Sequence, residues 1–425
     1  MRPNDLIHFC APARLVMGCG TRHQLPDLVH RLGWRHGVLV TDTFFTGQTT
    51  WVRELVDACS TRGIRMAVFD GGVPDPTTTL CDGAAARLAA AQGTDSFDHV
   101  IALGGGSNID LAKGLCLTLP TGLPIARFVG GIGQVRPLPL VAIPTTAGTG
   151  SEATPGAILV DPDNATKVAV MDNALRPQLA LIDPELTFTC PPRVTADAGI
   201  DAFTHAIESF VAIDSAGFDR AGSIDPGYSG RSSLTMLFAR ESMRLCIAWL
   251  AKAYRNGQDR QARVSMSYAS VYAALSYGNA GLHAGHGIAY AVAGQTHKSH
   301  GSTNAVVLPY VLDELRSARR AELLEVARLW GTPGSDDAAV NALPRLVRDL
   351  VSGLDIPTNL RDFGVPEDAL DALVADALAV SRLARAYPGP DVAAAYRRIV
   401  RRAFDGRLSS DAYGGAAPRP SAVTI

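Results

Sequence analysis

Histidines gather in one short stretch of this chain of 425 residues, and histidine is both a common metal ligand and a proton carrier. Four of the ten histidines lie within 18 residues: His283, His286, His297 and His300. Upstream, Asp201 and His205 are four positions apart in the apolar segment GIDAFTHAIESF, so on a helix they share one face and can reach one ion. Alone, this pair can also be a capping Asp and a hydrogen-bonded core His. With the cluster it indicates a metal site, because imidazoles and one carboxylate suit Fe(II) or Zn(II) and poorly suit Ca or Mg.

A glycine run follows a predicted strand in HVIALGGGSNIDLAK, where Gly104, Gly105, Gly106 and Ser107 precede a predicted helix. Glycines let the backbone approach a phosphate, and the free N–H groups at the start of the following helix bind anions. The run is not GxGxxG, and three glycines at a strand end also form a simple tight turn. Asp110 and Lys113, on the next turn, fit nucleotide contacts and fit a solvated helix face equally well.

Two further segments point to the same class of ligand. Residues 144–152, PTTAGTGSE, place hydroxyls and glycines behind a second strand, where they can wrap a diphosphate or a nicotinamide ribose or form a polar crossover. Asp42 ends the strand HGVLVTD, where a carboxylate can accept hydrogen bonds from an adenosine ribose or cap a helix. Taken with the glycine run, these segments favour a dinucleotide site over three unrelated turns.

The elements that must hold these residues differ between the two halves of the chain. In the first half, short β-branched strands (36–42, 65–76, 99–107, 137–152 and 179–186) alternate with helical stretches such as 81–92, which predicts a mainly parallel sheet. From Arg193 onward, apolar residues recur at helical spacing over 234–249, 259–277, 306–330, 339–352, 366–384 and 390–404. We expect an α/β dinucleotide-binding domain over 1–192, an all-α metal-binding domain over 193–408 and an extended tail over 409–425. Residues 214–233, rich in Gly, Ser and Asp, should form a long loop bordering the substrate entrance.

Composition excludes several classes of protein. The hydrophobic fraction of 47% and the charged fraction of 19% allow a large core and exclude global disorder. The net charge of -2 argues against a nucleic-acid partner or a polybasic membrane anchor. We see no signal or transit peptide and no stretch near the ~18 apolar residues of a membrane span. The seven cysteines are scattered without a CxxC pair, as expected for reduced thiols in a cytoplasmic protein.

Over nearly its whole length, the chain resembles the iron-containing (group III) alcohol dehydrogenase family. The segments that carry the resemblance are VTD (40–42), GGGSNIDLAK (104–113), PTTAGTGSEAT (144–154), Lys167, DAFTHAIESF (201–210), NAGLHAGHGIAY (279–290) and HGSTNAVVLP (300–309). The resemblance implies that the metal ligands are Asp201, His205, His286 and His300. It also implies a nicotinamide dinucleotide site lined by Asp42, Gly105, Gly106, Ser107, Asp110, Thr145, Thr146, Thr149 and Lys167.

One position departs from the commonest family pattern. Many members have a second His four residues after the ligand that matches His286, close to the nicotinamide, and here that position is Tyr290. This change, the long loop over 214–233 and the motif GLHAGHGIAY resemble the hydroxyacid–oxoacid transhydrogenase branch of the family. Members of that branch oxidise 4-hydroxybutyrate-type acids while they reduce a 2-oxoacid.

These parts predict reversible hydride transfer between a small alcohol or hydroxyacid and NAD, with NADP a poorer cofactor, at a centre of Fe(II) or Zn(II). Tyr290, His283 and His297 are the candidates for the proton relay, and His283 can equally be a packing residue or a support for a ligand. Two alternatives stay open: a dehydroquinate-synthase-like NAD- and metal-dependent lyase, and a non-catalytic paralogue. We also expect a homodimer.

Overall fold

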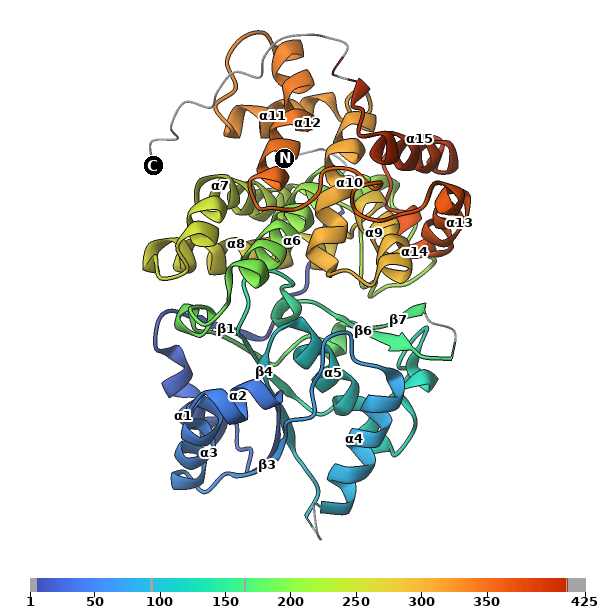
Figure 1. Cartoon of the computed structure of the whole chain (residues 1–425). Coiled ribbons are helices and arrows are strands. Elements are labelled where there is room, and N and C mark those ends of the chain that lie inside the picture. The colour runs from blue at the N-terminus through green and yellow to red at the C-terminus, as the bar shows by residue number, and fades with distance from the viewer. Residues whose placement is uncertain (1–5, 92–94, 164–165, 410, 412–425) are drawn as a thin grey trace. The chain divides into compact units, whose positions relative to one another are not determined.

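The computed structural model describes residues 6–91, 95–163, 166–409 and 411 (Figure 1). The chain folds into two compact units, and each is described here by itself. The α/β unit contains Cys10–Cys190 and Asp225–Gly227, whereas the helical unit contains residues 6–9, Pro191–Ile224 and the chain from Tyr228 onward. Three residues of the predicted long loop therefore belong to the α/β unit. The predicted tail over 409–425 lies outside the described residues, except for Ser409 and Asp411.

A six-stranded sheet with only parallel pairs forms the centre of the α/β unit, which confirms the predicted mainly parallel sheet. In spatial order its strands are β1 (Arg14–Met17), β8 (Leu179–Ile182), β5 (Leu140–Pro144), β4 (His99–Gly104), β2 (His36–Val40) and β3 (Arg65–Phe69). A separate antiparallel pair, β6 (Gly156–Asp161) and β7 (Thr166–Met171), was not predicted from the sequence.

Helices cover both faces of this sheet, so its central strands are buried throughout. Successive residues of β4 point to opposite faces, and Val100 and Ala102 pack with α4 (Thr78–Ala91) and α5 (Gly106–Thr121). Ile101 and Leu103 instead face the core shared with α1 (Leu25–Arg31) and α3 (Trp51–Thr61). Burial on both faces explains why these strands read as continuous apolar runs in the sequence.

The chain reverses its direction of travel across the sheet between β2 and β4. It runs from β2 outward to β3 and then returns across β2 to β4, so the segments that leave β2 and β4 diverge onto opposite faces. Helix α2 (Thr43–Gln48) follows β2, and α5 follows β4. Because the strands are parallel, their carboxyl ends share one edge, and the divergence there opens the crevice in which α/β sheets bind ligands.

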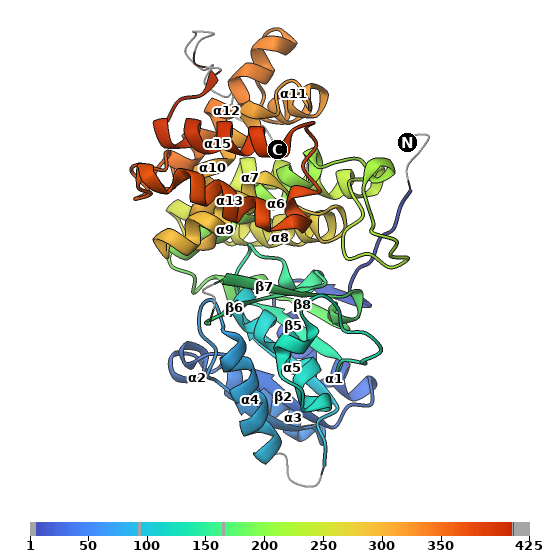
Figure 2. The same ribbon diagram turned by 90° about the vertical axis from the view of Figure 1, so that its right-hand side faces the viewer.

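Ten α-helices build the described part of the helical unit (Figure 2): α6 (Pro192–Val211), α7 (Ser233–Arg255), α8 (Arg260–Ala280), α9 (Ala284–Thr296), α10 (His300–Glu314), α11 (Arg320–Leu329), α12 (Asp336–Ser352), α13 (Leu370–Ala379), α14 (Ser381–Ala384) and α15 (Val392–Asp405). Helix α6 lies at their centre, with α7, α8 and α10 packed around it. No helix among the described residues is long and apolar enough to cross a membrane.

Two helices predicted as continuous are interrupted. The stretch 306–330 divides into α10 and α11, and the stretch 366–384 divides into α13 and α14. In the first break, the Arg319 guanidinium donates hydrogen bonds to the carbonyls of Val211 and Ala212, which end α6. The break therefore places a cap on a distant helix, a contact that local helical periodicity cannot reveal.

Helix α10 approaches α6 closely because Gly301 has no side chain. A Cβ at Gly301 would lie 2.0 Å from the backbone carbonyl oxygen of Asp197, in α6. The neighbouring Ser302 hydroxyl donates to the Asp197 carboxylate and accepts a hydrogen bond of 2.8 Å from Arg193. The two helices are thus in backbone contact at the N-terminus of α10.

We expect Gly301→Ala to destabilise the helical unit by about 1–3 kcal/mol, because the methyl group meets backbone that cannot move aside. Denaturant unfolding measures the change in the free energy of unfolding. Gly294→Ala is the matched control, because Gly294 is an exposed helical glycine of α9 with nothing within 4 Å of its Cβ position. That substitution should be neutral or stabilising. Equal stability of the two variants would contradict the close α6–α10 contact.

Candidate metal centre and nucleotide-binding edge

Three helices bring together, inside the helical unit, the four side chains that the sequence predicts as metal ligands. Asp201 and His205 lie one turn apart on α6, His286 lies in the first turn of α9, and His300 is the first residue of α10. One donor atom of each lies within 4.8 Å of the others. The Oδ1 atom of Asp201 is 3.7 Å from the Nε2 atom of His205, of His286 and of His300. The predicted ligands therefore converge on one carboxylate oxygen.

The donor set fits a divalent transition metal. Donors about 2.1 Å from a tetrahedral ion lie about 3.4 Å apart, close to the spacing between this carboxylate oxygen and the imidazoles. The Nδ2 atom of Asn304 lies 2.9 Å from Asp201 Oδ1, 3.1 Å from His286 Nε2 and 3.2 Å from His300 Nε2. An amide NH2 group has two hydrogens for these three neighbours, and the imidazole nitrogens accept a hydrogen bond only in their neutral form. With neutral imidazoles, the cluster is rich in acceptors and suited to a cation.

The electrostatics of the cluster also favour positive charge at its centre. Burial opposes ionisation of Asp201, but His205, His300 and His286 outweigh it and hold the pKa of that carboxyl well below its usual range. Burial likewise lowers the pKa of the His286 imidazole, but hydrogen bonds with Asp201 and Glu208 raise it to about 9. The pocket therefore holds an ionised carboxylate and attracts cations although it is buried.

Glu208 fixes the orientation of one ligand, a role that the sequence analysis missed. Its Oε2 atom lies 2.5 Å from His286 Nδ1, and its carboxylate accepts hydrogen bonds from the backbone N–H groups of Gly285 and His286. In the neutral imidazole, a proton on Nδ1 leaves the Nε2 lone pair of His286 directed at the cluster. Glu208 lies seven residues after Asp201 on α6, and Asn304 four after His300 on α10. The helical spacing that paired Asp201 with His205 could have found both.

Of the three proposed relay residues, His283 is buried beside Glu208 and His297 is exposed. His283 is fully buried at the N-cap of α9, with Nδ1 3.1 Å from Glu208 Oε1, and burial lowers the pKa of its imidazole. It faces the carboxylate that supports His286. His297 is exposed, in the left-handed conformation that ends α9, and it has no hydrogen bond or ring contact with the ligand histidines in the described structure.

Tyr290, the third, lies against the ligands. It is one turn after His286 on α9, and its ring stacks on His300 with 5.4 Å between the ring centroids. The same ring meets His286 edge-on at 6.3 Å. The half-buried phenol therefore borders the partly exposed ligand, since the side chain of His300 is 28% exposed while the other three are almost fully buried.

Three segments meet at the carboxyl edge of the sheet in the α/β unit. Gly105 is the N-cap of α5, and a Cβ at Gly106 would lie 2.7 Å from the side chain of Thr149, so the glycine loop packs directly on the loop after β5. Asp42, after β2, accepts hydrogen bonds from the Phe44 N–H at 2.9 Å and from the Asn108 side chain, in α5, at 2.7 Å. The Asp42–Asn108 bond joins the ends of β2 and β4 where the chain reverses direction.

Other predicted cofactor residues lie near the same edge. Ser107, in the first turn of α5, and Thr146 are half-buried, whereas Thr145 is buried and its N–H donates to the Gly104 carbonyl. A Cβ at Gly105 would lie 3.5 Å from Thr146. The glycine loop and the threonine loop thus present a continuous surface of backbone and hydroxyl groups.

Asp110 and Lys113 do not form the solvated helix face that was one of their two interpretations. The Asp110 carboxylate accepts hydrogen bonds from the Ser151 hydroxyl and from the Ile158 N–H. The buried Lys113 ammonium donates to Ser151, Thr154 and Gly156. Both hold the segment between β5 and β6 against α5. Lys167, on β7, forms an ion pair of 2.8 Å with Asp75.

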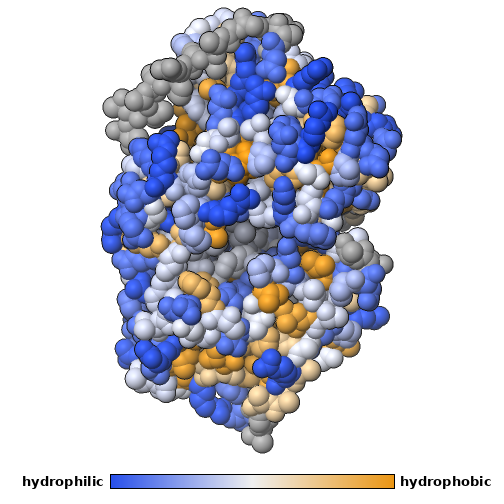
Figure 3. Space-filling view, in the orientation of Figure 1, coloured by the Kyte–Doolittle hydropathy of each residue, from blue (hydrophilic) through white to orange (hydrophobic). Residues whose placement is uncertain are grey.

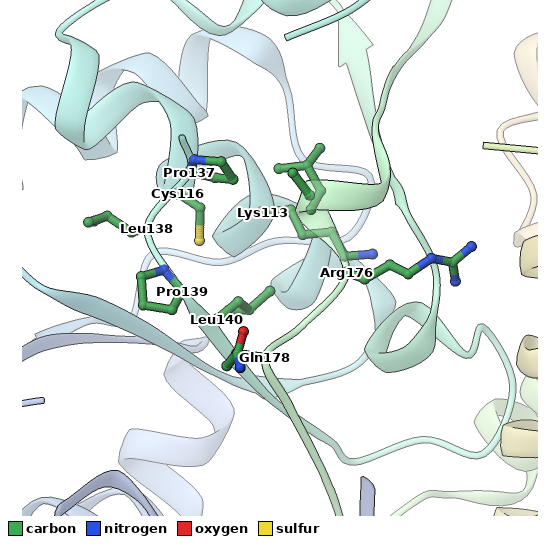
Figure 4. Close-up of a pocket in the computed structure, with 10 residues that line it drawn as sticks. Lys113, Cys116, Pro137, Leu138, Pro139, Leu140, Arg176 and Gln178 are labelled. Carbon is green, nitrogen blue, oxygen red and sulfur yellow. The ribbon is translucent and has the colours of Figure 1, made fainter. Parts of the chain in front are cut away.

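A cavity of about 150 Å³ lies elsewhere in the α/β unit (Figure 4). Lys113, Cys116, Arg176 and Gln178 are among its lining residues, and none of the dinucleotide-site residues implied by the family resemblance lines it. Both cations have protein partners, since Lys113 is bonded as above and Arg176 donates to the Ala153 carbonyl at 2.7 Å. We therefore assign its charged groups to holding the fold.

Comparison with known proteins places the whole chain in one family. Residues 12–184 match the family described as iron-containing alcohol dehydrogenase, and residues 228–397 match the C-terminal domain of the same family. A long-chain-alcohol dehydrogenase of Geobacillus thermodenitrificans is 35% identical over 92% of this chain and 95% of its own. The mitochondrial hydroxyacid-oxoacid transhydrogenase of Bos taurus is 30% identical over 92% of this chain and 88% of its own.

Solved structures agree. A 1,3-propanediol oxidoreductase superposes with a TM-score of 0.85 at 27% identity, over 94% of this chain and 100% of that one. A sulfoacetaldehyde reductase of Bifidobacterium kashiwanohense in complex with NAD+ superposes with a TM-score of 0.80 at 25% identity, over 94% of this chain and 98% of that one. With its parallel sheet and its helical unit, the chain belongs to the iron-containing alcohol dehydrogenase family of oxidoreductases.

Proposed function

We propose that this oxidoreductase transfers hydride between NAD and a small alcohol or hydroxyacid, with the reaction centred on a divalent metal. One observation carries the proposal: a single buried carboxylate oxygen, Asp201 Oδ1, lies 3.7 Å from three imidazole nitrogens. Three neutral imidazoles and one carboxylate suit Fe(II), the family metal, and also Zn(II).

In the helical unit, different residues would hold the metal, orient a ligand and move the proton. Asp201, His205, His286 and His300 would hold the ion, which supplies a Lewis acid that stabilises negative charge on the substrate oxygen. Glu208 keeps His286 in the ligating tautomer. Tyr290, whose ring borders the partly exposed His300, acts on the substrate side and moves or orients a proton through its phenol. His283, directed at Glu208, and the exposed His297 remain our candidates for carrying that proton further.

The carboxyl edge of the sheet would bind the dinucleotide. We propose that the start of α5 and the loop after β5 bind the phosphates and the nicotinamide half, through Gly105, Gly106, Ser107, Thr145, Thr146, Thr149 and Lys167, with Asp110 holding the loop. Asp42 would accept hydrogen bonds from the adenosine ribose. Apolar side chains also reach the surface of this unit (Figure 3); Phe44, two residues after Asp42, is 46% exposed and offers a ring for the adenine.

A transhydrogenase reaction, in which a 2-oxoacid reoxidises bound cofactor, is the second candidate. Tyr290 and the similarity to the bovine transhydrogenase favour it. The purified, metal-loaded protein should be assayed with alcohols and hydroxyacids, with and without free NAD, and with 2-oxoglutarate as acceptor. Turnover only with free NAD identifies a dehydrogenase. Turnover with the oxoacid and without free NAD identifies a transhydrogenase.

The lyase alternative lacks support. A dehydroquinate-synthase-like enzyme needs a basic cluster for a phosphate near the metal, and the segment 279–309 has only Lys298. The Lys298 ammonium donates to the Phe363 carbonyl at 2.5 Å and lies over the Phe363 ring.

The seven free thiols support our proposal of a cytoplasmic protein. We propose a homodimer, which gel filtration tests.

Removal of a ligand should abolish both metal binding and turnover. His286→Ala and Asp201→Ala each leave three ligands and remove the charge or the lone pair that holds the ion. Metal content and alcohol oxidation are measured on the same preparation, with His23→Ala as the control, since His23 is an exposed residue of the α/β unit. A ligand variant with full metal content and full turnover would refute the assignment.

Glu208→Gln should weaken metal affinity by about 10–100-fold while the fold is retained. The amide keeps the shape but loses the charge that holds the proton on Nδ1 of His286. Competition with a chelator measures the affinity without recourse to activity. Glu241→Gln, which removes a carboxylate paired with Arg244 on the surface of α7, should leave the affinity unchanged. The same affinity in both variants would assign Glu208 to packing alone.

The enzyme should prefer NAD(H) to NADP(H), because the Asp42 carboxylate would accept ribose hydroxyls and repel a 2′-phosphate. In Asp42→Gly the ratio of kcat/KM for the two cofactors should move toward NADP(H). The wild-type ratio is the reference, and Asp70→Gly tests a nearby half-buried carboxylate, which accepts a hydrogen bond from the Thr46 hydroxyl. A wild-type enzyme that already prefers NADP(H) would show that Asp42 does not discriminate between the two cofactors at the adenosine ribose.

A further inference from the structure

An arginine of the helical unit lies beside the metal cluster and has no anionic partner there. The guanidinium of Arg382, on the short helix α14, lies over the Tyr290 ring, with its carbon 5.6 Å from the ring centroid. That ring in turn stacks on the ligand His300 at 5.4 Å. The Tyr290 ring therefore lies between the positively charged Arg382 side chain and the partly exposed His300.

Arg382 differs from Arg231 and Arg319, two other inward-facing arginines of this unit. Arg231 pairs with Asp214 and Glu322, and Arg319 donates to two carbonyls at the end of α6. Arg382 forms no ion pair with any described residue, and its Nε atom is buried with no hydrogen-bond partner. A buried donor left unsatisfied costs about 1–3 kcal/mol, so a position that retains one needs an explanation.

The two carboxylates of the metal cluster are already engaged. Asp201 Oδ1 lies 3.7 Å from three imidazole nitrogens, and Glu208 accepts hydrogen bonds from the backbone N–H groups of Gly285 and His286, so neither carboxylate pairs with Arg382. Tyr290 is uncharged and attracts the guanidinium only through the face of its ring. No described residue supplies the acceptor that the buried Nε atom of Arg382 lacks.

We propose that Arg382 binds the carboxylate of a hydroxyacid or oxoacid substrate whose hydroxyl or carbonyl oxygen faces the metal ligands. The planar guanidinium offers paired N–H donors that match a carboxylate, which an alcohol without an acid group cannot use. Tyr290 would line the space between the two ends of the substrate. This inference rests on the proposed function and makes Arg382 the residue that selects acids over plain alcohols.

The test compares two substrates of equal chain length, 4-hydroxybutyrate and butan-1-ol, on the metal-loaded enzyme with NAD. Arg382→Gln should raise KM for 4-hydroxybutyrate by about 10–100-fold, the loss of a charge-assisted hydrogen bond, and should leave KM for butan-1-ol unchanged. Arg382→Lys keeps the charge without the paired donors and should recover part of the loss. Arg385→Gln is the matched control, because Arg385 is an exposed arginine three residues further along.

Calorimetry with butyrate gives a readout that does not depend on turnover. Butyrate should bind the wild-type protein and the Arg385→Gln variant, and should bind Arg382→Gln at least about tenfold more weakly. An equal loss with both substrates, or butyrate affinity unchanged in Arg382→Gln, would overturn the proposal and leave Arg382 as a packing partner of Tyr290. If the wild type oxidises neither substrate, the proposed function fails, and the butyrate titration still decides the role of Arg382.

Discussion

The helical unit depends on the burial of one ionised carboxylate, that of Asp201. A buried anion without partners would be costly, and here three imidazoles and the amide of Asn304 surround a single oxygen atom. These partners come from α6, α9 and α10, so the three helices must meet at one point. Gly301 permits the approach of α10, and Glu208 orients His286 from the opposite side. The lone pairs of Asp201 Oδ1 and of the three neutral imidazoles would repel one another, and a bound metal ion would instead attract all four.

The α/β unit depends on a different constraint, the parallel direction of its strands. All six strands deliver their carboxyl ends to one edge, so segments that are far apart in the sequence become neighbours there. Asp42 and the glycine loop are joined by the Asn108 side chain, and Gly106 admits Thr149 against the start of α5. Behind this edge, Asp110 and Lys113 hold the segment between β5 and β6 from within. The groups at this edge that we propose to face the dinucleotide are thus mostly backbone and hydroxyl groups, whereas Asp110 and Lys113 hold the fold together.

Polar groups that the two units bury fall into two kinds. Most are satisfied inside the protein, as Lys113 and Arg231 are, and these explain local breaks and caps without reference to any ligand. Others are left without a hydrogen-bond partner near the metal cluster, among them the Asn304 carbonyl and the Arg382 Nε. Arg382 lies over Tyr290 and Asn304 contacts His300, which is the side of the cluster where we propose that the substrate binds.

The sequence by itself determined the fold class, because the alternation of strands and helices and the position of glycines after strands are local patterns. It also determined which residue types could hold a metal, since Asp201 and His205 share a helical face by spacing alone. Tertiary structure decided the rest. His286 and His300 meet Asp201 only through the packing of α6, α9 and α10, and helical periodicity carries no information about which helices touch. The same reason hid the break at Arg319, the burial of Lys113 and the place of Arg382 over Tyr290, because each is a contact between residues far apart in the chain.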